Sequence, residues 1–296
     1  MANSLNNFNL AAIARDAIKY FGSEFFPVRV FARNFSEEIA QEGESVLTRV
    51  AGGMTASDLS GGYSTVQDVS TEGITVNLDA FKGHVAAFND SEISKARSAK
   101  WLMEQFFEPS REATVKSLVD DAFALVLASN YTNATTKTDA QFDADALADI
   151  GGNLTTRKVP KLGRSAIISP DYHTGLIQDL SIVDKSASGT DEPIREGRIQ
   201  RARGFNIYEY EGIPANGEYL TGIAMHPSAM AMAARPVFKP GVRHISVENM
   251  TEPKTGLPFQ FRIWYSPNEG EFRMSCGFLY GISKGLGASL ERIKSQ

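Results

Sequence analysis

Residues 44–81 carry the feature that most limits what this chain can fold into. Alternating side chains predict one strand over 46–50 and a second, clearer one over 74–80. The stretch between them, AGGMTASDLSGGYSTVQDVSTEG, is rich in Gly, Ser and Thr and poor in large apolar groups. Such a loop cannot pack a core of its own, and a loop of this length is uncommon inside a compact domain. We therefore expect the loop to have a function.

Three stretches before residue 131 are predicted to be helical. Apolar residues recur at helical spacing over 10–21, and Gly22 follows as a stop signal. The strongest helix prediction spans 109–130, because Pro109 suits a first turn, where its missing N–H is not needed. A shorter helical stretch over 91–107 is expected to precede it.

The pattern from 131 to 236 is mixed α/β. Asp143 is expected to cap a short helix that ends at the Gly-Gly pair 151–152. A strand over 164–168 leads into a capped helix start, and a strand over 219–225 leads likewise into a predicted helix of small residues, AMAMAA. The segment FNIYEYEG, between these two junctions, is predicted to be a strand.

Residues 237–296 are predicted to be mostly β. Apolar residues alternate over 245–247, 259–265 and 272–276. Ser266–Gly270 has turn chemistry and is expected to join two long strands.

Composition excludes several classes of protein. The chain has 296 residues, of which 42% are hydrophobic and 22% charged, which is typical of one large or two modest globular domains. Lys and Arg number 30 against 35 Asp and Glu, a net charge of −5 that argues against a polycation condensing nucleic acid. No apolar run reaches the roughly 18 residues of a membrane span, and the N-terminus lacks the order of a secretory signal. We expect no membrane partner.

Signatures of catalysis are weak. The four histidines have no metal-ligand spacing, and the acids over 139–145 do not complete a calcium loop. The glycines of 281–290 match neither a dinucleotide nor a phosphate loop and predict a flexible connection. The single cysteine, Cys276, excludes a disulfide within the chain and alternates with Phe272 and Met274, which predicts a buried, inert thiol. We therefore expect no enzyme, no cofactor and no metal.

One charged cluster has two interpretations. Basic and acidic residues of this cluster are interleaved: Arg195, Arg198, Arg201 and Arg203 with Asp191, Glu192 and Glu196. A solvated loop is the simpler interpretation, because exposed ion pairs contribute little. The alternative is a ring of arginine–carboxylate contacts between copies of the subunit.

Four segments resemble, in the same order, those of the major capsid proteins of tailed bacteriophages, which have the Hong Kong 97 (HK97)-like shell fold. VRVFARNFSEEIAQEGESVLTRV resembles the arm entering the extended loop, and EPSREATVKSLVDDAFALVLASNYT resembles the spine helix. REGRIQRARGFNIYEYEGIP and GIAMHPSAMAMAARP resemble the axial domain and the segment that returns from it. The resemblance covers nearly the whole chain.

The resemblance implies an α+β fold with four parts. These are an N-terminal arm (1–35), an extended β-hairpin loop or E-loop with its return strand (36–90), a peripheral domain with the spine helix and long strands (91–130 and 236–296), and a mixed α/β axial domain (131–235). An arm and a polar hairpin that cannot bury themselves are explained if they lie across neighbouring subunits.

The implied function is structural. The chain would self-assemble, as hexamers and pentamers, into an icosahedral head shell that encloses double-stranded DNA without sequence-specific binding. It would be located in the virion and assembled in the host cytoplasm. The implied further partners are a separate scaffolding protein, a portal and a decoration protein. Contacts between subunits are expected at Met54, Leu59 and Tyr63 near the loop tip, and at Arg195, Arg198, Arg201 and Arg203.

Covalent crosslinking is not expected. Some relatives crosslink through a lysine on the extended loop, but here no lysine occurs between Tyr20 and Phe81, and only Lys82 remains at the base of the loop. Two alternatives stay open. One is an encapsulin-like nanocompartment shell with the same fold. The other is a cytoplasmic α/β enzyme whose long loop is a mobile lid.

Overall fold

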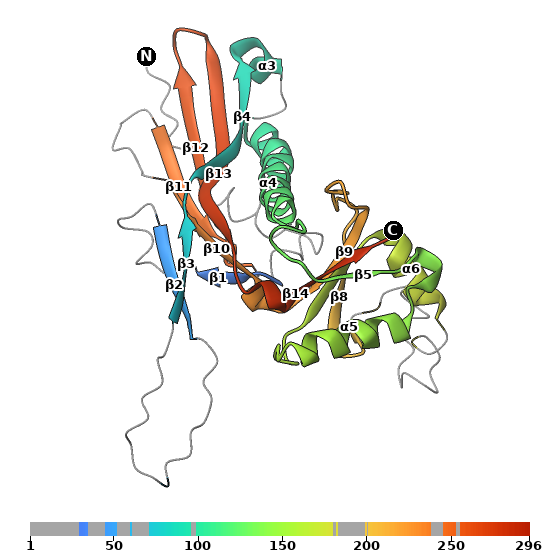
Figure 1. Cartoon of the computed structure of the whole chain (residues 1–296). Coiled ribbons are helices and arrows are strands. Elements are labelled where there is room, and N and C mark those ends of the chain that lie inside the picture. The colour runs from blue at the N-terminus through green and yellow to red at the C-terminus, as the bar shows by residue number, and fades with distance from the viewer. Residues whose placement is uncertain are drawn as a thin grey trace.

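The computed structural model describes residues 30–34, 45–51, 60, 71–95, 99–179, 182, 199, 201–237, 245–252 and 255–296. These residues form two six-stranded sheets and one two-stranded ribbon (Figure 1). The first sheet contains β1 (Ala32–Asn34), β10 (Met230–Arg235), β13 (Glu271–Lys284), β12 (Pro258–Ser266) and β11 (Ile245–Thr251) in that order, with β4 (Ala80–Asn89) also paired to β13.

The long strand β13 organises the first sheet. It pairs antiparallel with β12, with β4 and, at its far end, with β10. The turn at residues 266–270 joins β12 to β13, and the alternating strands predicted over 245–276 are confirmed. Residues 281–290 are not the flexible connection that we expected, because β13 continues to Lys284 and a 3-10 turn, η5 (Gly287–Ser289), follows.

One long helix covers one face of this sheet (Figure 1). Helix α4 (Ala99–Ala124) follows the short α3 (Asp90–Lys95), and buries Val115, Leu118 and Phe123 against the sheet. The predicted start at Pro109 is wrong: the helix passes through this proline and ends at Ala124 rather than near 130. Packing along α4 outweighs the loss of one backbone hydrogen bond at a proline.

The second sheet contains β5 (Ala134–Thr136), β14 (Leu290–Lys294), β9 (Leu220–Met225), β6 (Ser165–Ile168), β8 (Phe205–Glu209) and β7 (Arg201–Ala202). Its strands come from both the middle and the end of the chain, because β14 lies between β5 and β9. Helices α5 (Ala144–Thr156) and α6 (Pro170–Gln178) pack on one face, with η3 (Asp139–Gln141) beside α6.

Between residues 131 and 236 the predicted strands are confirmed as β6, β8 and β9, whereas two of the helix predictions need correction. The Asp143 side chain accepts a hydrogen bond from the Ala146 N–H at 2.9 Å and caps α5. The helix does not end at the glycine pair 151–152, however, but continues to Thr156. The segment AMAMAA is not a helix. Its first residue, Ala229, ends the turn η4 (Pro227–Ala229), and its other five residues lie in β10, a strand of the first sheet whose two faces are both buried. A strand covered on both faces needs no alternation of polar residues.

Among the described residues, three passages of the chain cross between the two sheets and are bonded to one another. The Tyr131 hydroxyl donates to the Ala229 carbonyl at 2.8 Å, and the Gly285 N–H donates to the same oxygen at 2.8 Å. The Ser228 and Ser289 hydroxyls lie 2.9 Å apart. We call these passages, residues 125–133, 226–229 and 285–289, the junction.

The ribbon consists of β2 (Ser45–Ala51) and β3 (Thr71–Asn77), paired antiparallel as predicted from their alternation. Its base contacts the first sheet, where Val76 and Leu78 pack on Ala231 and Ala233. A Cβ atom built at Gly281 would lie 1.7 Å from the Asn77 carbonyl oxygen, so only glycine allows this close approach. The ribbon is thereby held against β13 and β10.

Candidate assembly surfaces

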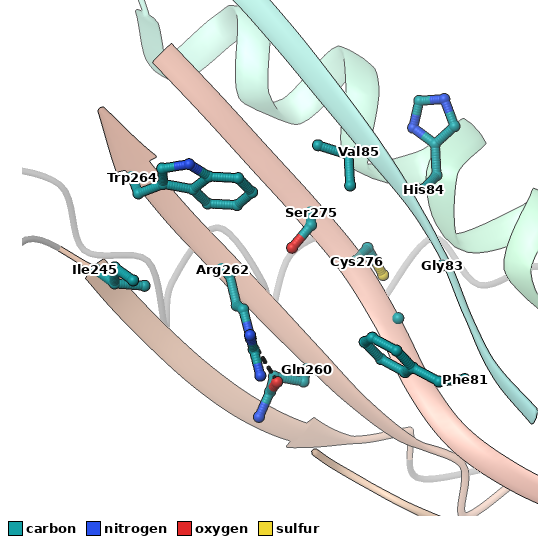
Figure 2. A pocket seen from close by; sticks show the side chains of 11 residues that line it. Phe81, Gly83, His84, Val85, Ile245, Gln260, Arg262, Trp264, Ser275 and Cys276 are labelled. Atoms are coloured by element: carbon teal, nitrogen blue, oxygen red, sulfur yellow. Dashed lines mark hydrogen bonds between the residues drawn. The ribbon is translucent and has the colours of Figure 1, made fainter. Parts of the chain in front are cut away.

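The face of the first sheet that is turned away from α4 carries exposed apolar side chains. On β4, Phe81 is 62% exposed and Val85 is 57% exposed. They line a hollow of about 370 Å³ that also includes Ile245, Trp264 and Arg262 (Figure 2). Exposed large apolar groups that gather in one place mark binding surfaces more often than isolated ones do.

Two glycines form the floor of this hollow. Gly83 on β4 lies directly opposite Gly277 on β13. A Cβ atom at Gly83 would lie 2.5 Å from the Cys276 carbonyl oxygen, and one at Gly277 would lie 2.8 Å from the Lys82 carbonyl oxygen. Because neither strand has a side chain here, the hollow opens onto bare backbone. Apolar side chains form part of its walls, and its polar lining residues are His84, Gln260, Arg262 and Ser275. The Arg262 Nε donates to the Gln260 side-chain oxygen at 2.7 Å.

The other face of β4 carries a charged anchor. The Lys82 ammonium donates to both carboxylate oxygens of Asp121 on α4, at 2.9 and 2.7 Å. The Tyr280 hydroxyl of β13 donates to the same carboxylate. Burial is the main cause that raises the pKa of Tyr280, and its bond to Asp121 raises it further. Lys82 is thus held within its own chain, next to the base of the ribbon.

The residues that we predicted at subunit contacts are only partly described. Met54, Leu59, Tyr63, Arg195 and Arg198 lie outside the described residues. The structure places the other two, Arg201 and Arg203, at the β7–β8 hairpin on the edge of the second sheet. Arg203 has a positive φ of 47° and is followed by Gly204 with a φ of 87°. This turn projects the Arg203 side chain, and its Nη2 lies 3.9 Å from the Asp145 carboxylate.

Burial or partners within the chain account for three titratable side chains of the described residues, Cys276, His173 and His226. No group of three or more metal-ligating side chains occurs among them. The buried Cys276 lies in the core face of β13, where burial raises the pKa of its thiol to about 12. His173 is buried 3.3 Å from the Glu209 carboxylate, and His226 accepts from the Ser228 N–H as a cap. Within the described parts of the chain, no helix is long and apolar enough to cross a bilayer.

The sequence analysis missed the exposed face of β4. The strand AFKGHVAAFN has apolar side chains on both faces: Ala86 and Phe88 face the core, whereas Phe81 and Val85 face outward. The sequence did contain a signal for this face, because residues 80–89 have apolar side chains on both faces. A single helix covers only one side of such a strand, which leaves the other apolar face exposed.

Comparison with known proteins gives a match at the level of the fold. No protein-family model matches the sequence, and no curated protein matches it. A structure from Mycobacterium phage Che8 matches with a TM-score of 0.62 at 19% identity, covering 90% of this chain and 89% of that one. The capsid of cyanophage P-SCSP1u matches with a TM-score of 0.63 at 13% identity, covering 90% and 86%. The capsid asymmetric unit of cyanophage Pam1 matches with a TM-score of 0.62 at 10% identity, covering 93% of each chain.

These similarities extend over nine-tenths or more of the chain rather than over one motif. The chain therefore has the α+β fold of phage capsid structures. At such identities the similarity concerns the fold, and the function is a separate inference.

Proposed function

We propose that this chain is the major capsid protein of a tailed phage and that it forms the head shell. The observation that carries the proposal is the match to phage capsid structures along about nine-tenths of the chain. The outward face of the first sheet supports it, because Phe81 and Val85 would be covered by neighbouring subunits.

The expected HK97-like parts can be assigned to the observed elements as part of this proposal. Helix α4 would be the spine helix, and the β2–β3 ribbon would be the base of the E-loop within 36–90. The first sheet would belong to the peripheral domain, 91–130 with 236–296, joined by β1, β4 and β10 from outside these bounds. The second sheet would belong to the axial domain, 131–235, joined by β14 from the end of the chain. Residues 1–35 would be the N-terminal arm. Copies would meet as hexamers and pentamers, with a scaffolding protein, a portal, a decoration protein and the packaged DNA as further partners in the virion.

The proposed shell is not crosslinked. Lys82 is engaged by Asp121 of its own chain, and it lies at the base of the ribbon. A denaturing gel of purified particles is expected to show this protein as one band at the mass of a single chain. A ladder of multimers that resists boiling and reducing agent would contradict this part of the proposal.

Negative-stain electron microscopy tests the main proposal. The protein would be purified alone and after co-expression with its neighbouring genes. Closed shells of uniform size are the expected result, and DNA as their content would identify a phage head. Protein cargo would instead identify an encapsulin-like compartment. A small monodisperse species under both conditions would contradict the shell and favour the alternative of an enzyme.

A further inference from the structure

A basic groove lies beside α5 on the second sheet. It has a volume of about 440 Å³, and its charged residues are Lys161, Arg164 and Arg203. The α5 side of the groove consists of small side chains, namely Ala148, Gly151, Gly152 and Thr155. Small residues along one stripe of a helix leave room for another chain to come close to the helix backbone.

Arg164 fixes the positive charge of this groove. Its side chain is buried and donates to three carbonyl oxygens, those of Pro160, Val159 and Gly151, at 2.9, 2.7 and 2.8 Å, and to the Thr155 hydroxyl at 3.1 Å. No carboxylate of the described residues forms an ion pair with it. Its hydrogen bonds are therefore satisfied while its charge remains uncompensated, which favours a negative group in the groove.

The other two cations are accessible. Lys161 is exposed, and Arg203 projects from the β7–β8 turn over the groove. The nearest described acid is Asp145, 3.9 Å from Arg203, and both side chains are exposed, at 91% and 48%. An exposed pair at this distance contributes little to stability, so it does not hold Arg203 away from a stronger partner.

The complementary charge lies near the other end of α5 in the same chain. Residues 139–149 contain four aspartates and no basic residue, whereas residues 157–164 contain four basic residues and no acid. Attraction to the helix dipole explains acids in a first turn and bases in a last turn, but it acts only within those turns. Lys161 lies beyond the end of α5, and Asp139 begins η3, whose three residues make too short a helix for a strong dipole, so the separation of charge needs another explanation.

Two of the acids form an exposed corner. Asp139 of η3 and Asp171 of α6 are exposed, and both act on Tyr172, where burial is the larger cause that raises its pKa. The two elements pack closely, because a Cβ atom at Gly175 would lie 3.0 Å from the Asp139 carbonyl oxygen. We call Asp139 and Asp171 the acidic corner.

We propose that the basic groove of one copy binds the acidic corner of a second copy, carboxylates to cations, in a head-to-tail contact. Different patches of the two copies meet in such a contact, so successive copies continue around a ring, as hexamers and pentamers require. The inference rests on the proposed function, because it assigns one contact of the shell. It also explains how chains that each carry a net charge of −5 can associate.

Charge reversal tests the contact. The variant K161E/R203D reverses the accessible charges of the groove, and aspartate tolerates the positive φ at position 203. We expect the variant to fold, by thermal unfolding, and its shell yield to fall by roughly tenfold or more, since 1.4 kcal/mol per contact already gives that factor. The control K116E changes an exposed lysine of α4 and is expected to assemble like the wild type.

A rescue variant keeps the test decisive. Adding D139K/D171K to K161E/R203D exchanges the charges of both partners and is expected to restore shells. Normal assembly of K161E/R203D would overturn the inference while the proposed function stands. The inference would also be overturned if the four-residue variant folds but does not assemble. It would be overturned too if K161E/R203D assembles and loses only the retention of DNA, since a DNA phosphate would then be the ligand of the groove. Absence of shells from the wild type would instead refute the proposed function itself.

Discussion

At the residue scale, Gly281 sets how closely the ribbon approaches the first sheet. The Asn77 carbonyl of β3 occupies the space where any other residue would have a side chain. The backbone cannot move away without separating Val76 and Leu78 from the alanines of β10. The position of the ribbon on the first sheet therefore depends on one residue of β13, Gly281.

Replacing this glycine is expected to be severe. Gly281→Ala should lower the free energy of unfolding by about 3 kcal/mol or more, because a methyl group overlaps backbone atoms. Gly152→Ala is the matched control: nothing lies within 4 Å of its Cβ position in α5, so we expect stability to rise by roughly 0.5–1 kcal/mol. Urea unfolding of unassembled chains measures both changes. Equal changes in the free energy of unfolding from the two substitutions would contradict the close approach of the Asn77 carbonyl to Gly281.

Cys276 is expected to be inert in the folded chain. Burial raises the pKa of its thiol to about 12, so at pH 8 only about one thiol in ten thousand is ionised. A thiol reagent such as Ellman's reagent should label the folded chain far more slowly than the urea-unfolded chain. Rapid, complete labelling at pH 8 without denaturant would be inconsistent with the packing of β13.

His173 is expected to make stability depend on pH. Burial is the main cause that lowers its pKa in the folded chain, although Glu209 acts in the opposite direction. A histidine of lowered pKa stabilises the fold above its unfolded pKa of about 6.5, and this contribution is lost as the pH falls below that value. The free energy of unfolding should therefore fall between about pH 7 and pH 5. His173→Asn should reduce this slope, and an unchanged slope would count against the assignment.

At the scale of secondary-structure elements, the sequence predicted strands better than helix limits. The strands β3, β12 and β13 alternate in polarity because one of their faces is less covered, so their pattern is visible. The segment AMAMAA does not alternate in polarity, because both faces of β10 are buried, and its alanines and methionines favour helix by propensity. Pro109 misled for a similar reason: tertiary packing along α4 decides whether the helix continues. The groove at Arg203 combines residues of α5, of the loop that follows it and of the β7–β8 turn, which no local pattern reveals.

The strand β14 is held by a buried acid. Glu291 is 2% exposed and accepts from Arg157, Asn153 and Thr135. Glu291→Gln keeps the shape but removes the charge, so we expect the free energy of unfolding to fall by about 1.5–3 kcal/mol. Thermal or urea unfolding measures this loss. Lys294→Gln, at the less buried end of the same strand, should change stability by less than about 0.5 kcal/mol. If Glu291→Gln leaves the free energy of unfolding unchanged, the charged contact between Arg157 and Glu291 does not stabilise β14.

At the scale of the whole molecule, the outward face of the first sheet is expected to matter for assembly and not for folding. Phe81→Ser with Val85→Ser should leave the unfolding temperature of the isolated subunit nearly unchanged, because both side chains are exposed. Shell yield should fall roughly tenfold, since apolar burial is worth about 25 cal/mol per Å². Tyr219→Asn, a change at an exposed aromatic residue of the second part, is the control. Normal shells from the double variant would exclude this face from the contacts.

The junction between the two sheets has a mechanical consequence. A hinge requires one or two flexible strands, whereas here three passages, residues 125–133, 226–229 and 285–289, are bonded to one another. Bending or twisting at the junction would break several of these hydrogen bonds at once. The angle between the two sheets is therefore expected to stay the same in every copy. Copies at positions of different curvature would then keep the same internal angle. The difference in curvature would be taken up by the contacts between them.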